Sequence, residues 1–306
     1  MTKPYLPKKT GKTVSLILGS GGARGLAHIG IIHWLEEQGY EIRFVSGSSM
    51  GALVGGVYAA GKLDEFVDWF KKLTNTDILG LADIAWDRSG LIKGDKLFET
   101  IKELIGDPNI EDLEIPFTAV ATDIENEKEV WLQTGSLLKA IRASISLPMI
   151  FTPYQWHNMT LIDGGVLNPM PIAPTFGQNN DLTIAVDLGG KAIFDGPGTD
   201  ENQEELDEDS WLNDVTGLFT SLKEHFLSKE NSLKKTLEKS FNLDVYEVSN
   251  KAFDSMQNTI ARQKLAAYPP DITIEIPRNA CGMMEFTKVN EMIALGYRMA
   301  QETLGK

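Results

Sequence analysis

Several features that would assign a chain to other classes of protein are scarce in this sequence. There is one cysteine, Cys281, so an intrachain disulfide is excluded and nothing points to the oxidising compartments where disulfides form. No apolar run approaches the ~20 residues of a membrane span, and none follows the N-terminal lysines as it would in a signal peptide. We therefore expect a cytoplasmic protein that is at most peripheral at a membrane.

Basic residues are also few. The chain has 29 Lys and Arg against 43 Asp and Glu, which gives a formal net charge of -14. Half of that charge lies in residues 200–209, which hold seven acids and no base. Nucleic-acid binders need basic surface to displace counterions, so the composition argues against a nucleic-acid partner. The acidic run predicts a solvated loop, and we assign it no function.

Short apolar runs alternate with longer segments of helical spacing along most of the chain. Because this alternation is typical of parallel sheets covered by helices, we expect an α/β fold with a largely parallel sheet. Gly39 and Gly61 are placed to end the first two helices, and Asp64 and Asp95 to cap the next two. The expected strands are residues 14–18, 41–46, 116–124, 129–134, 159–163, 182–188 and 271–277.

The pattern changes after Asp187. Residues 191–210 are polar and acidic, which predicts a loop, and residues 211–268 read as a helical segment. Apolar residues at helical spacing within 211–226 allow two interpretations: a helix packed on the domain, or a lid or lipid-contacting insertion. A strand and a helix over residues 270–303 end the pattern. We expect a single domain over residues 1–306, with a motif-bearing core at about 12–190.

One motif lies at the turn between the second expected strand and its helix. Gly47-Ser48-Ser49-Met50-Gly51 fits the pattern G-x-S-x-G, with Ser49 in the nucleophile position. The two glycines allow a sharp turn that projects the serine hydroxyl away from the sheet, and the following helix directs its positive N-terminus toward developing negative charge. The pentapeptide alone is weak, and its strand-to-helix context strengthens the prediction.

A glycine-rich segment, "LGSGGARGLAH", directly follows the first strand. Free N–H groups at such a turn bind anions. A phosphate-binding P-loop is excluded, because Leu6 stands where its first glycine is required. Ser20 and Arg24 each interrupt one register of a dinucleotide fingerprint. The remaining functional interpretation is an oxyanion hole formed by the amides of Gly21 and Gly22, beside the alternative of a tight turn without ligand.

The third motif is "LIDGGVLNPMPI", in which Asp163 ends an apolar strand and precedes two glycines. Such an aspartate could be aimed at one partner, or it could only cap its own turn. The four histidines, His28, His33, His157 and His225, do not fit the order of a Ser-acid-His triad, so each is expected to be structural. Asp163 remains as the candidate base for Ser49.

Taken together, these residues resemble the patatin-like phospholipase family. The resemblance rests on "SGGARG" (residues 20–25), "GSSMG" (47–51) and "DGG" (163–165) in that order. It is strong over residues 12–190 and looser from about 250. The first motif of the family usually begins with glycine, where this chain has Ser20.

The resemblance implies a three-layer α/β/α sandwich and a catalytic dyad without histidine. Ser49 would be the nucleophile and Asp163 the general base, with Gly21 and Gly22 as oxyanion donors and Arg24 in the basic position of the same loop. Such enzymes cleave acyl esters of phospholipids, lysophospholipids or neutral lipids through an acyl-enzyme, generally without calcium, cofactor or metal. Contact with membrane surfaces would be transient. The motifs do not encode the headgroup, acyl length or oligomeric state.

Two alternatives from other classes remain open. The strand, glycine loop and helix are shared with nucleotide- and dinucleotide-binding α/β proteins. A catalytically silent scaffold that binds lipid would carry the same motifs.

Overall fold

The computed structural model describes residues 11–81, 92–193 and 232–305 of the chain. The chain divides into two compact units, one of Met1–Ile193 with Gln257–Lys306 and one of Phe194–Met256. The three motifs all lie in the first unit. Of the second unit, the structure describes the part of helix α8 (Ser232–Ala267) that precedes Gln257. The expectation of a single domain stays a prediction.

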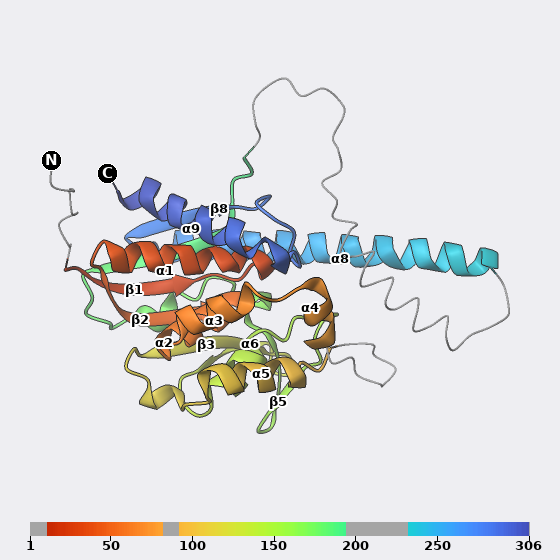
Figure 1. Ribbon diagram of the computed structural model, residues 1–306, viewed down its shortest axis with the longest axis horizontal. Helices are drawn as coiled ribbons and strands as arrows, with labels where there is room; N and C mark the ends of the chain where they lie inside the picture. Colours follow the sequence, from red (N-terminus) through yellow and green to blue (C-terminus); the bar gives the residue numbers. More distant parts are fainter. Residues whose placement is uncertain (1–10, 82–91, 194–231, 306) are drawn as a thin grey trace, which may run out of the picture. The chain divides into compact units, whose positions relative to one another are not determined.

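The first unit is built around one sheet of eight described strands (Figure 1). Its order is β5-β6-β3-β2-β1-β7-β8, with β4 paired to β3 outside this path. The pairs among β3, β2, β1, β7 and β8 are parallel, whereas β4, β5 and β6 add antiparallel pairs. The strands are β1 Thr13–Leu18, β2 Glu41–Ser48, β3 Phe117–Asp123, β4 Lys128–Leu132, β5 Tyr154–Trp156, β6 Met159–Asp163, β7 Leu182–Gly190 and β8 Ile272–Pro277.

Most helices of the first unit pack on one face of the sheet. Val14, Leu16 and Leu18 of β1 point into this layer and belong to its large apolar core. Figure 1 shows α1 and α9 side by side in front of the strands. Besides α8, the described helices of this unit, including the short 3-10 helices labelled η, are η1 Gly22–Leu26, α1 Ala27–Glu37, α2 Met50–Ala59, α3 Leu63–Phe70, α4 Asn75–Leu81, α5 Asp95–Ile105, η2 Ile110–Asp112, α6 Leu137–Ser144, η3 Gly164–Val166, η4 Ala173–Thr175, η5 Phe286–Lys288 and α9 Val289–Leu304.

The opposite face of the sheet packs against the last turns of α8 and against the segment that contains Met170 and Ile172. Ile17 of β1 and Ala185 of β7 form a second, smaller core there with Met170, Ile172 and Ala261. Strand β1 is therefore buried on both faces, as the central strand of a layered α/β fold should be. The expected three-layer arrangement, with a mainly parallel sheet between helices, is confirmed.

The helix boundaries correct two of the sequence predictions. Helix α3 has Lys62 as its N-cap and α5 has Gly94, so Asp64 and Asp95 lie within the first turns instead of at the caps. Carboxylates in a first turn still interact favourably with the helix dipole, which explains their position. Gly39 and Gly61, by contrast, follow the ends of α1 and α2 in left-handed conformation, as predicted.

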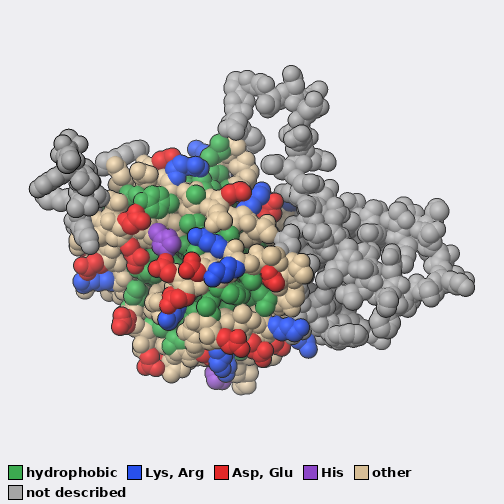
Figure 2. All heavy atoms as spheres, in the orientation of Figure 1, with side chains coloured by type: hydrophobic (Ala, Val, Ile, Leu, Met, Phe, Trp, Pro, Cys, Tyr) green, Lys and Arg blue, Asp and Glu red, His purple; other side chains and the backbone are tan. Residues whose placement is uncertain are grey.

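The acidic run at 200–209 and the apolar positions of 211–226 lie outside the described residues, so their predicted roles stay predictions. Within the described part, no helix combines the length and the apolar character needed to cross a bilayer. On the face drawn in Figure 2, acidic and basic side chains are interspersed among apolar ones.

Candidate active site

The turn between β2 and α2 holds Ser49 in a strained conformation. Its backbone has φ 56° and ψ -123°, in the positive-φ half of the map that side-chain-bearing residues rarely adopt. A Cβ on Gly47 would collide with the backbone of Gly51, and one on Gly51 with the carbonyl of Leu18. Both flanking glycines are therefore required for the chain to close this corner, as G-x-S-x-G predicts.

Ser49 meets Asp163 across the corner. The Ser49 hydroxyl donates to Asp163 Oδ2 at 2.6 Å, although the residues are 114 positions apart. The other carboxylate oxygen, Oδ1, accepts the Gly165 N–H at 2.7 Å. Asp163 is thus both the cap of its own Gly-Gly turn and the partner of Ser49, one oxygen for each task. The two interpretations of the D-G-G motif are compatible.

The register of the sheet brings these residues together. Strand β4 pairs along one edge of β3, so β2 and β6 share the other edge. Ser48, at the end of β2, lies opposite Val120, and Asp163, at the end of antiparallel β6, lies opposite the next residue, Ala121. Two strands that run toward each other along β3 therefore deliver Ser49 and Asp163 to the same point.

The Asp163 side chain is shielded from solvent. The residue is fully buried, and burial raises the pKa of its carboxyl to about 7, although the hydrogen bonds from Ser49 and Gly165 favour the charged form. Near neutral pH such a carboxylate can accept a proton and release it again. That property is what a general base requires, because proton transfer works best when the pKa lies close to the working pH.

The glycine loop lies at the end of β1 and leads into η1. The N–H of Ser20 donates to the carbonyl of Pro169 at 2.8 Å, and that of Ala23 to the carbonyl of Met283 at 2.7 Å. Between them, the N–H groups of Gly21 and Gly22 donate no hydrogen bond to any described residue. Two adjacent unused donors at a strand end are what an anion or oxyanion site needs.

Close packing explains why both loop positions are glycine. A Cβ on Gly21 would lie 2.7 Å from Leu188 Cβ, and one on Gly22 would collide with the Met283 carbonyl. Gly22 also has a positive φ of 58°. Arg24 of the same loop is buried, and its guanidinium donates to the carbonyl of Arg278 at 3.2 Å. Arg24 therefore ties η1 to the segment that follows β8.

The described histidines hydrogen-bond to neither Ser49 nor Asp163. His28 is fully buried, and its Nε2 donates to the Gly19 carbonyl at 2.9 Å, which anchors the glycine loop to α1. Burial lowers the pKa of this imidazole to about 4, so it is neutral at physiological pH. His33 lies 3.2 Å from an Asp64 carboxylate oxygen, and His157 packs edge-on against Trp156. His225 lies outside the described residues.

Sequence reasoning missed two serines, one at the end of α6 and one two positions after it. The Ser144 hydroxyl accepts the Ser49 N–H at 2.9 Å and donates to the Val120 carbonyl at 2.6 Å, so it fastens the corner to β3. The Ser146 carbonyl accepts the Asp163 N–H at 2.9 Å. The signal in the sequence is a pair of serines in "AIRASIS", at the helix end and two positions after it, which does not say what they contact.

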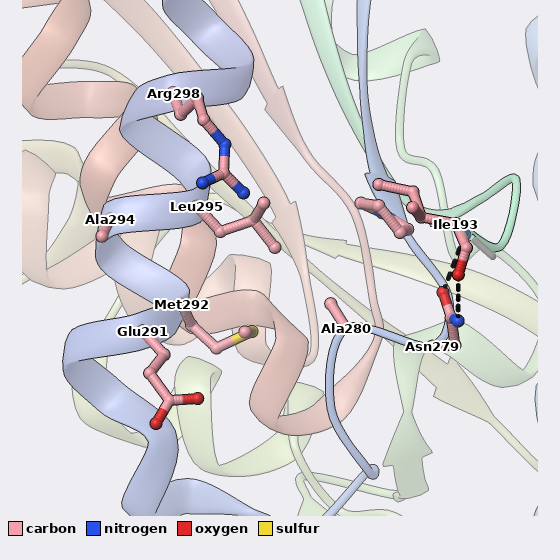
Figure 3. Close-up of a pocket in the computed structure, with 9 residues that line it drawn as sticks. Ile193, Asn279, Ala280, Glu291, Met292, Ala294, Leu295 and Arg298 are labelled. Carbon is pink, nitrogen blue, oxygen red and sulfur yellow. Dashed lines mark hydrogen bonds between the residues drawn. The ribbon is translucent and has the colours of Figure 1, made fainter. Parts of the chain in front are cut away.

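A separate cavity of about 450 Å³ lies between the end of β8 and α9 (Figure 3). Its lining includes Ile193, Met292, Leu295 and Arg298, and the Asn279 amide holds the backbone of Ile193 with two hydrogen bonds. Its lining includes neither Ser49 nor Asp163 nor any residue of the glycine loop. Among the described residues, no three His, Cys, Asp or Glu side chains gather as a metal site would require.

Comparison with known proteins gives a consistent set of relatives. A family model described as patatin-like phospholipase matches residues 16–176. Uncharacterized NTE family proteins of Mycobacterium tuberculosis and Mycobacterium bovis are each 39% identical, over 95% of this chain and 91% of their own length. The neuropathy target esterase sws of Drosophila melanogaster is 34% identical over 60% of this chain and 13% of that protein.

Among solved structures, VipD from Legionella pneumophila matches with a TM-score of 0.46 at 13% identity, over 95% of this chain and 66% of that one.

Proposed function

Because the chain belongs to the patatin-like phospholipase family, we propose that it is a serine acyl hydrolase in which Ser49 is the nucleophile and Asp163 the general base. The family is one of lipid acyl hydrolases. The observation that carries the proposal is the 2.6 Å hydrogen bond from the Ser49 hydroxyl to a fully buried carboxylate, at a corner that strains the serine backbone. Strain and a buried, paired carboxylate both cost stability, and functional sites are where such costs concentrate.

Acylation follows from the groups in place. Ser49 Oγ attacks the ester carbonyl carbon while its proton passes to Asp163 Oδ2. The carbonyl oxygen becomes an oxyanion, which the N–H groups of Gly21 and Gly22 stabilise together with the N-terminus of α2. As the intermediate collapses, the bond to the leaving alcohol breaks and Asp163 returns the proton to that oxygen. The fatty acyl group remains on Ser49 as an ester.

Deacylation uses the same groups in reverse. A water molecule gives its proton to Asp163 as it attacks the acyl carbon, and the same amides hold the second oxyanion. The intermediate then releases the fatty acid, and Ser49 recovers its proton from Asp163. A single carboxylate thus acts as base and acid in alternation, for which a pKa near neutrality is suited.

The substrates we propose are acyl esters of phospholipids, lysophospholipids or neutral lipids, met during transient contact with a membrane surface. All proton transfers in this scheme run through Asp163, so no calcium ion is required. We expect hydrolysis of a short p-nitrophenyl ester to proceed at an unchanged rate in EDTA, whereas a strong loss on chelation would contradict the scheme.

Matched substitutions test the dyad. Ser49→Ala and Asp163→Asn should each reduce hydrolysis of the p-nitrophenyl ester by at least about a thousandfold, as losses of activated nucleophiles do. Asp163→Asn keeps an oxygen for the Gly165 N–H and places an NH2 group, which cannot take a proton, where Oδ2 accepts the Ser49 hydroxyl. Ser48→Ala and Asp123→Asn make the same changes at a neighbouring serine and at another buried aspartate, and should retain activity.

Retention of activity in Ser49→Ala or Asp163→Asn, with the circular dichroism spectrum of the unsubstituted protein, would refute the dyad. If the unsubstituted protein binds lipid vesicles but hydrolyses no ester, the chain is a lipid-binding scaffold. Binding of NAD or ATP in calorimetry would instead support the nucleotide-binding alternative.

A further inference from the structure

The start of the glycine loop is held by a side chain that lies 237 positions later in the sequence. Gln257, on α8, donates from Nε2 to Ser20 Oγ at 3.1 Å. Only 4% of the residue is exposed, so the side-chain amide loses its hydration when the protein folds. Burying an amide is costly unless it is hydrogen-bonded, and the bond to Ser20 supplies that compensation.

Three functional groups converge over Gly165. A Cβ at this position would collide with Gln257 Nε2 and would lie 2.5 Å from Ser20 Oγ and 2.9 Å from Asp163 Oδ1. The absence of a side chain on Gly165 therefore makes room for the Ser20–Gln257 contact directly beside the carboxylate of the dyad. The second glycine of the D-G-G motif has a role in this contact as well as in the turn.

Ser20 is hydrogen-bonded through both its backbone and its side chain, and it directly precedes the Gly21 and Gly22 N–H groups. Its backbone N–H is held by the Pro169 carbonyl and its side chain by Gln257, and the unused donors of Gly21 and Gly22 come next. A shift of Ser20 would therefore move those donors relative to Asp163. Errors of about 1 Å in such geometry can reduce rates about a hundredfold.

The side-chain amide of Asn258, the next residue of α8, also packs closely against a glycine. A Cβ on Gly189, at the end of β7, would collide with Asn258 Oδ1. Adjacent residues of α8 thus each occupy space left by a glycine at the active-site edge of the sheet. The position of this turn of α8 is set by close fit at two places, which makes a chance contact of Gln257 a poor explanation.

We propose that Gln257 is a positioning residue for the ester hydrolysis. By holding Ser20, it fixes where the Gly21 and Gly22 N–H groups lie relative to Asp163. The proposal rests on the proposed function. It also gives the Ser20 side chain a role, because its hydroxyl is the group that accepts the Gln257 amide.

The experiment compares Gln257→Met with Gln263→Met in the full chain. Methionine keeps the length and packing of glutamine and removes the amide, and Gln263 is an exposed residue of the same helix. With a p-nitrophenyl ester, Gln257→Met should lower kcat about ten- to a hundredfold and change KM less than about twofold, because the loss affects the transition state. Gln263→Met should leave both values unchanged.

Ser20→Ala completes a double-mutant cycle. If the two side chains act through one contact, Ser20→Ala should lower kcat by a factor similar to that of Gln257→Met, and the double variant should be no slower than either single one. Thermal unfolding of each variant separates a positioning role from a structural one. A loss of activity no larger than the loss of folded protein would refute the proposal.

The outcomes also separate the two proposals. If the unsubstituted protein is active and Gln257→Met retains its kcat, or if the two substitutions multiply in their effects, the positioning role is wrong and the dyad stands. If the unsubstituted protein hydrolyses no acyl ester and a fluorophosphonate does not label Ser49, the proposed function fails and this inference fails with it.

Discussion

At the scale of single residues, Asp163 is held rigidly by hydrogen bonds that favour its ionised form, and yet its carboxyl has a pKa near neutrality. One carboxylate oxygen closes the local turn through Gly165, and the other accepts the Ser49 hydroxyl. Both contacts favour the ionised form, yet burial outweighs them and raises the pKa to about 7. The residue is therefore held in place by its turn while it stays able to gain and lose a proton.

The pH dependence of hydrolysis should report the Asp163 carboxyl. Because only its ionised form can take the Ser49 proton, kcat/KM should be constant above about pH 7 and fall about tenfold per unit below it. A pH–rate profile with the p-nitrophenyl ester measures this directly. An acid limb near pH 4, where exposed carboxylates titrate, would contradict the burial argument.

The Asp163 carboxyl should also affect stability, but in the opposite direction: the rise in pH that increases activity should lower the free energy of unfolding. Between about pH 4 and 7 the folded protein keeps on Asp163 a proton that the unfolded chain has lost, so this group makes the free energy of unfolding fall as pH rises through that window. Asp163→Asn removes the titration. Urea unfolding at pH 5 and pH 8 should show the variant gaining stability relative to the unsubstituted protein at the higher pH. A difference that does not change with pH would count against this account.

Ser144 and Ser48 provide a contrasting pair of buried hydroxyls. Ser144→Ala leaves the Ser49 N–H and the Val120 carbonyl without their partner, which should cost about 1–3 kcal/mol of unfolding free energy and lower kcat by loosening the corner. Ser48 Oγ has no hydrogen-bond partner among the described residues, so Ser48→Ala should cost little. Urea unfolding and kcat of both variants test this, and equal losses would contradict it.

The sequence predicts Ser49, Asp163, Gly21 and Gly22 as candidates because their motifs are local. Each depends on neighbours within a few residues: glycines that permit a turn, a strand before it and a helix after it. Ser144 and Gln257 could not be found in this way. Their partners lie 95 and 237 positions away, and a serine or glutamine in a helix carries no local sign of a distant contact.

At the scale of elements, helices α1 and α9 approach through reciprocal glycines. A Cβ on Gly30 of α1 would collide with the Ile293 carbonyl, and one on Gly296 of α9 with the Ala27 carbonyl. The clashing atoms belong to the backbone, so the helices would have to separate to make room. Helix α9 also contacts η1, which links this crossing to the glycine loop.

Gly296→Ala should therefore destabilise the protein by about 1–3 kcal/mol, despite the higher helix propensity of alanine. Gly80 in α4 is exposed and has open space at its Cβ position, so Gly80→Ala should be neutral or stabilising by up to about 1 kcal/mol. Urea unfolding of both variants gives the comparison. If both change stability in the same direction by the same amount, the crossing is looser than described.

Elements were predicted well where apolar periodicity and glycine punctuation coincide, as in β1, β2, α2 and α9. The short strand β5 and helix α4 carry too few residues to show a period, and they were missed. The caps at Asp64 and Asp95 were wrong because a carboxylate serves a helix start equally well one or two positions inside it. Pairing partners were not predictable, so the antiparallel return of β6 along β3 came from the structure.

At the scale of the whole chain, the candidate site depends on contributions from well-separated regions. Strands β1 and β2 bring the glycine loop and Ser49, β6 brings Asp163, and α8 brings Gln257. Relatives at 39% identity match the chain over nearly its full length, whereas the family model covers residues 16–176, which lack Gln257. The region after 176 therefore contributes a side chain that contacts the glycine loop.

In the proposed mechanism, Ser49 is a nucleophile activated by Asp163. Intact-mass and peptide mass spectrometry after treatment with a fluorophosphonate tests it most directly, because the reaction needs no knowledge of the natural substrate. We predict one adduct, on Ser49, which is absent in Ser49→Ala, slowed at least about a hundredfold in Asp163→Asn and unchanged in Ser48→Ala. Labelling at another residue, or equal rates with and without the Asp163 carboxylate, would contradict the account.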